Sequence, residues 1–402
     1  MIGVTEAFRL LMAHSHPKES TILALEAAQG RVLAEDILAD RPFPPYDRVM
    51  MDGIALAHAS LEKGTFAFPI EKTQAAGEEA WILSHPDLCV EVMTGAICPI
   101  HADTVIPLED LDLVEGLARV QKKEGVRKGQ FIHRQGSDKL AGALLLPQGT
   151  LLHPLALSVA AAVGKASLRV WQFPKTIIIS SGDELVPVEA DPKGQQVRIS
   201  NTHALAGVLG RFGIRADTRH FPDDVDRLRR EMPEILKEYS LVLLSGGVSA
   251  GKFDFFPMVL REAGVQTHFH KIAQRPGKPF LFGTYQNCHV FAFPGNPVST
   301  MVCALRYLVP WLQESMACRL SPQWRAKLRD SLPASGDLTV FAPVRLSQGE
   351  NDASLWAIPL SGNGSGDFTG LLEADGFLEL PGGEGPFGGD TLYSYWPLSF
   401  NL

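Results

Sequence analysis

The sequence lacks any apolar run of about 18 residues, the length that a membrane-spanning helix needs. Its amino terminus places Glu6 and Arg9 inside an amphipathic pattern and has no apolar core typical of a signal peptide. The five cysteines are scattered, odd in number and without a CxxC pair, which favours free thiols in a reducing compartment over a structural zinc site. We therefore expect a cytoplasmic protein that does not associate with a membrane.

Positive charge is also scarce, because 37 lysines and arginines face 45 aspartates and glutamates and leave a formal net charge of −8. This acidity argues against a nucleic-acid-binding protein, although a local basic patch can still bind an anionic small molecule. The length of 402 residues exceeds what one hydrophobic core usually serves. At about 150 residues per domain, we expect roughly two to four domains.

Standard nucleotide-binding and nucleophile motifs are missing or misplaced. There is no GxxxxGK[ST] loop, and the only GxGxxG, residues 383–388, lies between β-like runs rather than before a helix. Residues 247–251 match the GxSxG pattern, but Ser249 lies in a longer loop and has no clear acid and histidine partners. A standard NTPase, a dinucleotide oxidoreductase and a serine hydrolase are therefore disfavoured, and we expect Ser249 to make hydrogen bonds within its loop.

Two histidine pairs have a spacing that could suit metal ligands. His14 and His16 end the first predicted helix, and His268 and His270 alternate on one predicted strand. Neither pair has a third ligand at a usual spacing. We expect these four side chains to be exposed or hydrogen-bonded rather than bound to a metal.

Residues 1–47 and 147–173 predict a helical and linker region. Thr5 is placed to cap the first helix, and residues 20–28 have the pattern of a second helix. Each proline of the segment that ends this region lacks an amide donor, so no helix can continue there. Residues 48–146 then consist of short β-like runs separated by Gly, Asp and Pro turns, which predicts a β-rich second domain.

Residues 174–322 predict an α/β domain in which apolar strands alternate with amphipathic helices. The clearest strand, 240–245, runs into a Gly/Ser loop, and ligands of such sheets bind beyond the carboxyl ends of the strands. Either Asp223 or Asp224 opens the preceding helix. Residues 323–402 return to β-like runs with glycine-rich turns, which predicts a small β-barrel or sandwich. The expected fold class is multi-domain α/β plus β, with a C-terminal β-barrel.

The residues best suited to bind a ligand or to catalyse a reaction lie in the loops at predicted strand ends. These loops are 181–184, 246–254, 275–278 and 294–297. Glycine amides, Arg275 and Lys278 suit a phosphate or another oxyanion. The carboxylates of Asp183, Glu184 and Asp254 suit Mg²⁺ or a general base. The combination predicts phosphoryl-type chemistry on a charged ligand.

Short motifs in a fixed order extend over nearly the whole chain. They are MDG at 51–53, MTGA at 93–96, SGDEL at 181–185, SN at 200–201, SGGVSAG at 245–251 with Asp254, PGKP at 276–279, PGNPVS at 294–299, GSG at 364–366 and ADGF at 374–377, followed by LP at 380–381. This series resembles the molybdopterin molybdenumtransferase family, known as MoeA and as the gephyrin E domain. The resemblance implies a central α/β domain of the mononucleotide-binding, molybdopterin-binding-like kind.

The resemblance further implies an enzyme of the last step of molybdenum-cofactor synthesis. Such an enzyme inserts molybdate into the dithiolene of adenylylated molybdopterin and releases AMP, with Mg²⁺ assisting. An elongated homodimer is also implied, whose cleft lies between the α/β domain of one subunit and the β-rich second domain of the other. No nucleic acid and no membrane belong to this expectation.

The matched motifs and the strand-end loops together assign the residues of the cleft. The catalytic group is Asp52, Asp138, Glu184, Asp254 and Lys278, of which Glu184 and Asp254 are also the expected Mg²⁺ ligands. The substrate-binding group is Thr94, Ser245, Gly246, Gly247, Ser249, Gly251, Arg275, Pro294, Gly295, Asn296, Pro297 and Ser365. One of Asp223 and Asp224 matches a further acid of the cleft.

Several residues depart from the family pattern. They are Arg275 where lysine is usual, Val49 where serine precedes MDG, Ile54 where an aromatic follows it, and His133 and Ser137 where arginine and glutamate are usual. These departures bear on substrate detail, including molybdate against tungstate, more than on the fold. Two alternatives stay open: a nucleotide or pyridine-nucleotide hydrolase on a related fold, and a non-catalytic molybdopterin-binding scaffold.

Overall fold

The computed structural model describes residues 1–16, 19–122, 124–248, 255–318, 323–334, 336–349, 354–361 and 366–399. The predicted site residues Ser249, Gly251, Asp254 and Ser365 lie outside these ranges. The chain divides into two compact units, one made of Met1–Glu35, Gln148–Leu157 and Ala166–Leu402, the other of Asp36–Pro147 and Ser158–Lys165. The finer division into four domains stays a prediction.

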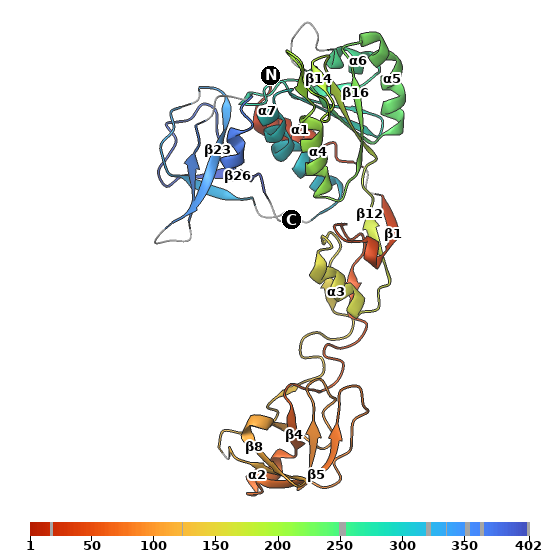
Figure 1. Ribbon diagram of the computed structural model, residues 1–402, viewed down its shortest axis with the longest axis vertical. Helices are drawn as coiled ribbons and strands as arrows, with labels where there is room; N and C mark the ends of the chain where they lie inside the picture. The colour runs from red at the N-terminus through yellow and green to blue at the C-terminus, as the bar shows by residue number, and fades with distance from the viewer. Residues whose placement is uncertain are drawn as a thin grey trace. The chain divides into compact units, whose positions relative to one another are not determined.

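The first unit contains a sheet whose edge strand β16 is labelled in Figure 1. Its six strands follow the order β16-β13-β17-β21-β20-β18. Its first four strands are parallel, and β20 and β18 are antiparallel additions. Every residue of β13, β17 and β21 is buried, which explains why these strands are continuous apolar runs in the sequence. The bounds are β13 Thr176–Ser181, β16 Ala216–Phe221, β17 Leu241–Ser245, β18 Gln266–Phe269, β20 Leu281–Tyr285 and β21 Cys288–Phe293.

Helices cover both faces of this sheet. One hydrophobic cluster includes residues of α1, α4, α7 and α8, and the other includes residues of α5 and α6. The Asp224 side chain caps α5 by accepting from the Arg227 N–H at 3.0 Å, which decides between the two candidate aspartates. The bounds are α1 Val4–Met12, α4 Asn201–Gly210, α5 Val225–Glu238, α6 Phe256–Glu262, α7 Pro297–Cys303, the π-helix η3 Ala304–Leu308 and α8 Val309–Ser315.

Two predictions for the first 30 residues are wrong. The expected helix at 20–28 is the strand β1 (Ser20–Ala24) followed by the 3₁₀ turn η1 (Leu25–Ala27). β1 pairs antiparallel with β12 (Ser167–Trp171), and this partner far away in the sequence overrides the local helical pattern. Helix α1 begins at Val4 after Gly3, with no side-chain cap, so Thr5 lies within the helix and does not cap it.

The C-terminal region of the first unit forms the predicted β-barrel. Its strands follow the order β23-β24-β22-β26-β25, and β25 pairs back with β23 to close the ring. The short strand β19 joins from the α/β region by pairing parallel with β23. The bounds are β19 Gln274–Arg275, β22 Arg325–Leu328, β23 Thr339–Gln348, β24 Leu355–Pro359, η4 Gly370–Glu373, β25 Gly376–Leu380 and β26 Leu392–Pro397. Outside the barrel, β14 (Leu185–Val186) and β15 (Val197–Arg198) form a separate parallel pair.

The second unit is β-rich, as predicted. A curled six-stranded sheet has the order β7-β4-β6-β5-β9-β8, and two short pairs, β3 with β10 and β2 with β11, lie outside it. The bounds are β2 Ile37–Leu38, β3 Arg48–Val49, β4 Gly53–Leu56, α2 His58–Glu62, β5 Ala67–Gln74, β6 Cys89–Val92, β7 Thr104–Pro107, η2 Leu108–Asp110, β8 Leu111–Val114, β9 Leu117–Val120, β10 Ile132–His133 and β11 Leu144–Leu146. Helix α3 (Pro154–Ala162) is shared between the two units.

None of the helices in the described ranges is both long enough and apolar enough to cross a membrane.

Candidate active site

The parallel register of the α/β sheet brings three predicted loops to one edge. The last residues of β13, β17 and β21 are neighbours, since Ser180 pairs with Ser245 and Ser245 with Phe293. The chain leaves each strand at this level, and carboxyl ends of parallel strands are where ligands bind in such sheets. Ser245 itself is buried, whereas Gly295 and Asn296 in the loop after β21 are exposed.

The turn after β17 is held tightly to its neighbours. Gly246 has φ +88°, and a Cβ on it would lie 3.0 Å from the Ser181 carbonyl oxygen, so a glycine is required. Its N–H donates to the Phe293 carbonyl at 3.2 Å and is therefore already engaged. The N–H of Gly247 has no partner within the described part of the chain, which leaves it available to an oxyanion.

Asn201 is a linking residue that the sequence analysis did not assign to the site. Its side-chain amide donates to Ser245 Oγ at 3.0 Å and to the Gly295 carbonyl at 2.7 Å. It therefore ties the ends of β17 and β21 together from the first turn of α4. The motif SN pointed to this position, but only the sheet order brings it between the two loops.

The acidic residues lie around the end of β13. The Asp223 N–H donates to Asp183 Oδ1 at 3.0 Å, and Ser181 Oγ donates to Asp223 Oδ1 at 3.3 Å. Asp223 therefore joins the loops of the sheet edge, whereas Asp224 serves as the helix cap. The Glu184 carboxylate folds over Gly182 so closely that a Cβ there would overlap it.

Two exposed cations lie on one short segment, residues 275–278, which we call the cationic loop. Arg275 and Lys278 are exposed, and neither forms an ion pair with another described residue. The loop starts in β19, whose pairing with β23 fixes it to the C-terminal barrel. Unpaired cations held on an anchored backbone suit an anionic ligand.

These loops line a cavity of about 930 Å³ within the first unit. Its polar side includes predicted site residues, namely Glu184, Gly246, Gly247, Arg275, Lys278, Pro294, Gly295 and Asn296. Its apolar side comes from the barrel and includes Leu338, Pro343, Pro359, Leu360, Leu371 and Leu380. The sequence analysis missed the apolar side, because isolated apolar residues of short strands carry no local signal of a ligand. A site of this size, with one ionic and one apolar wall, fits a ligand that has both an anionic group and a ring system.

A Mg²⁺ site is only partly represented in the described residues. No group of three or more His, Cys, Asp or Glu side chains suitable for a metal occurs among them. Glu184 nevertheless presents an exposed carboxylate to the cavity, and Mg²⁺ is commonly held by one or two carboxylates together with substrate phosphate oxygens. Its expected companion Asp254 lies outside the described residues, so the metal assignment stays a prediction.

In the second unit, the structure brings Asp52 and Thr94 together. Asp52 Oδ1 accepts from the Thr94 N–H at 2.6 Å and from Thr94 Oγ1 at 2.8 Å. The backbone hydrogen bond and then the hydroxyl hydrogen bond from Thr94 lower the pKa of the Asp52 carboxyl. Asp52 is thus held as an exposed carboxylate anion at a fixed position.

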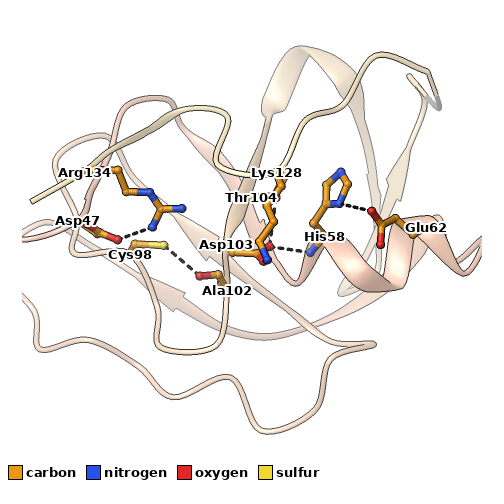
Figure 2. Close-up of polar contacts among 9 residues, drawn as sticks. All are labelled: Asp47, His58, Glu62, Cys98, Ala102, Asp103, Thr104, Lys128 and Arg134. Atoms are coloured by element: carbon orange, nitrogen blue, oxygen red, sulfur yellow. Dashed lines mark hydrogen bonds and ion pairs between the residues drawn. The ribbon is translucent and has the colours of Figure 1, made fainter. Parts of the chain in front are cut away.

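The third predicted residue of this unit, Asp138, belongs to a separate chain of contacts. Asp138 Oδ1 accepts from His133 Nε2 at 2.8 Å, and Arg48 donates to His133 Nδ1 at 3.2 Å. His133 departs from the family pattern, yet it still presents a donor to Asp138. Figure 2 shows the nearby guanidinium of Arg134 directed at Asp47, an ion pair of 2.5 Å that holds this segment in place.

Three of the four histidine rings are hydrogen-bonded, as expected. His14 donates to the Leu10 carbonyl and His270 to the Val248 carbonyl, and His268 Nε2 shares a hydrogen bond with Thr284 Oγ1, each at 2.8 Å. The fold also brings the pairs together, since the His14 and His268 rings lie 3.9 Å apart. The expectation for the fourth ring is wrong, because His16 is partly buried, its Nδ1 has no hydrogen-bond partner among the described residues, and the ring packs 5.7 Å from that of His289.

Comparison with known families assigns almost the whole chain. Residues 2–164 match the MoeA N-terminal region (domain I and II), residues 177–314 a probable molybdopterin binding domain, and residues 325–388 the MoeA C-terminal region (domain IV). A protein of Synechocystis sp. called molybdopterin molybdenumtransferase is 36% identical over 399 residues, which is 98% of this chain and 100% of that protein. The chain belongs to the molybdopterin molybdenumtransferase family. It is accordingly an enzyme of molybdenum cofactor biosynthesis.

Two further comparisons agree with this membership. A molybdopterin molybdenumtransferase of Synechococcus elongatus is 36% identical, with 96% of each chain covered. The crystal structure of a molybdopterin biosynthesis MoeA protein from Pyrococcus horikoshii is 26% identical with a TM-score of 0.78 and covers 98% of this chain and 99% of its own. The expected fold class of the family is therefore confirmed over all regions of the chain.

Proposed function

We propose that this enzyme inserts molybdenum from molybdate into the dithiolene of adenylylated molybdopterin and releases AMP. The observation that carries the proposal is that one cavity is lined both by Arg275 and Lys278, which have no ion-pair partner among the described residues, and by apolar residues of the barrel. The cations suit molybdate and phosphate oxygens, and the apolar wall suits a pterin or adenine ring. The names of the relatives, which specify molybdopterin and a molybdenum transfer, support the same substrate class.

The residues of the cavity divide the binding task. Arg275 and Lys278 attract the molybdate dianion, and the Gly247 N–H, which has no partner among the described residues, binds a phosphate oxygen. Glu184 and Asp254 would hold Mg²⁺, which when bound neutralises charge on the phosphates of the bridge to be cleaved. The apolar residues of the barrel bind the ring system, because contact with them removes apolar surface of the ring from water.

The test is AMP release from adenylylated molybdopterin with Mg²⁺, with and without molybdate. We expect molybdate-dependent AMP release that Lys278→Ala reduces by roughly tenfold or more, since one charge-assisted contact is lost. Lys237→Ala is the matched control, because Lys237 pairs with Glu234 on the surface of α5. AMP release without any oxyanion requirement would favour a nucleotide hydrolase instead, and failure to bind either form of molybdopterin would refute the proposed substrate.

We also propose a homodimer in which Asp52, Thr94 and Asp138 of one subunit serve the cleft of the other. The family resemblance supports this arrangement, and the fixed Asp52 carboxylate supplies a suitable group. Mixing Asp52→Ala and Lys278→Ala subunits, each impaired on its own, tests it, because one intact cleft can then form per mixed dimer. An activity above that of either variant alone is expected, whereas confirmed mixed dimers that are no more active than the single variants would contradict a shared cleft.

A further inference from the structure

The cationic loop is organised around one buried side chain, Gln274, which is only 1% exposed. Its Nε2 donates to the carbonyl oxygen of Pro276 at 3.0 Å, so the side chain bridges the bend that carries Arg275. Its Oε1 accepts from the hydroxyl of Tyr307 at 2.5 Å. Because a carbonyl oxygen only accepts, the Pro276 carbonyl requires the Nε2 end of Gln274 to face the loop, which leaves Oε1 for the Tyr307 hydroxyl.

The far side of the loop is closed by Gly277 and Cys303. The Cys303 thiol donates to the Gly277 carbonyl at 3.7 Å and accepts from Gln274 Nε2 at the same distance. Gly277 has φ +91°, and a Cβ on it would lie 2.7 Å from both Cys303 Sγ and Gln274 Nε2. The backbone between Arg275 and Lys278 is therefore packed directly against these buried groups and cannot shift without breaking their contacts.

The support for this arrangement comes from the π-helix η3. Tyr307 is completely buried on η3, and its ring stacks on Phe280 at 5.2 Å. The preceding residue, Arg306, pairs with Glu379 of the barrel at 2.9 Å. A π-helix is rare and often marks a functional site. In η3, Tyr307 contacts Gln274 beside the cationic loop, and its neighbour Arg306 contacts the barrel that forms the apolar wall.

We propose that Tyr307 and Gln274 are positioning residues for the reaction, holding Arg275 and Lys278 where both cations meet the same oxyanion. This inference rests on the proposed function, because it assumes that the cationic loop binds molybdate. Tyr307 has no exposed surface and cannot touch a substrate, so it acts through Gln274. Loss of its hydroxyl leaves Gln274 Oε1 buried without a donor and frees the amide to turn away from Pro276.

The test is Tyr307→Phe, compared with Tyr239→Phe. Tyr239 is also nearly buried in the same α/β region, and its hydroxyl donates to Asp217 at 2.7 Å, away from the cavity. We expect Tyr307→Phe to raise the KM for molybdate and the Kd for tungstate, measured by calorimetry, by roughly tenfold, since small misplacements of binding groups have large effects. The kcat at saturating molybdate should stay within about twofold, and Tyr239→Phe should change neither constant.

A double-mutant cycle separates positioning from a general loss of stability. If Tyr307 acts through Gln274, then Tyr307→Phe combined with Gln274→Met should raise the KM no further than Gln274→Met alone. Gln274→Met has a side chain of similar length and replaces Tyr307→Phe as the test variant if Tyr307→Phe does not fold. Multiplied effects of the two substitutions would show independent roles and overturn the inference.

The two readouts distinguish this inference from the proposed function. If a folded Tyr307→Phe variant keeps the KM for molybdate and the Kd for tungstate unchanged, the positioning role is overturned. The proposed function is still upheld in that case if the unmodified enzyme releases AMP in a molybdate-dependent way. If the unmodified enzyme binds tungstate but releases no AMP, a weakened Kd in Tyr307→Phe still supports the positioning role. Absence of tungstate binding by the unmodified enzyme would refute the oxyanion site and the inference with it.

Discussion

His289 should make the α/β region lose stability as the pH falls from about 6.5 towards 4. The ring is 4% exposed, and its Nδ1 is buried without a hydrogen-bond partner in the described structure. It lies 5.0 Å from the ring of Trp311 and 5.7 Å from that of His16. Burial, aided by the charges of His16 and His14 and opposed by backbone hydrogen bonding at Ser240 and Asn287, lowers the pKa of His289 from 6.5 to about 4.

The sign and size of the effect follow from proton binding. Between pH 6.5 and 4 the unfolded chain binds a proton at His289 that the folded chain does not, so acidification favours unfolding. At pH 5 the difference amounts to about 2 kcal/mol, rising to about 3 kcal/mol once the pH reaches the folded pKa. Burial also lowers the pKa values of His16 and His268, so their effects add in the same direction.

Urea unfolding, followed through Trp fluorescence at pH values from 7 to 4.5, measures this loss. We expect His289→Phe, which keeps an aromatic ring beside Trp311 but cannot bind a proton, to flatten the pH dependence by about 2 kcal/mol at pH 5. His203→Gln, at an exposed position of α4, controls for the loss of a histidine as such. Parallel stability curves for the unmodified protein and His289→Phe would refute the reasoning.

Three further predictions concern single contacts. Thr94→Val removes the hydroxyl hydrogen bond to Asp52 and should raise the Asp52 pKa towards its ordinary value in a carbon NMR titration. Thr73→Val, which removes a hydroxyl bonded to Glu91, is the control, and an unchanged Asp52 titration in Thr94→Val would show that the hydroxyl does not lower this pKa. Arg306→Met leaves the partly buried Glu379 carboxylate with the Trp396 indole N–H as a donor and should cost about 1.5–3 kcal/mol of unfolding free energy in urea. The double change with Glu379→Leu should recover part of this loss, and no recovery would argue against the pair. Gly277→Ala should lower the free energy of unfolding more than Gly194→Ala. Both glycines have positive φ, but only at Gly277 would the added Cβ also meet buried atoms, so equal losses of unfolding free energy would mean that φ alone sets the cost.

The predictable part of the fold consists of elements whose burial is uniform or periodic. β17 is a run of four buried apolar residues followed by the buried Ser245, and α5 combines an amphipathic pattern with an aspartate at 223 or 224 as its cap, so both were recognisable locally. Residues 20–24 were not, because their strand exists through pairing with β12 about 145 residues later. The π-helical segment η3 between α7 and α8 was not recognisable either, because no sequence pattern indicates it.

The candidate site divides in the same way. The sequence alone determined the strand-end loops, the cations at 275 and 278 and the family. These features are local, because glycine and proline set the backbone conformation at their own positions and each cation carries its charge wherever the chain places it. Only the tertiary structure decided that β19 joins the barrel, that Gln274 turns inward to Tyr307 and that barrel residues form the apolar wall. Such contacts join segments far apart in the chain, and their free energy comes from burial and hydrogen bonding that arise once the sheet and barrel have formed.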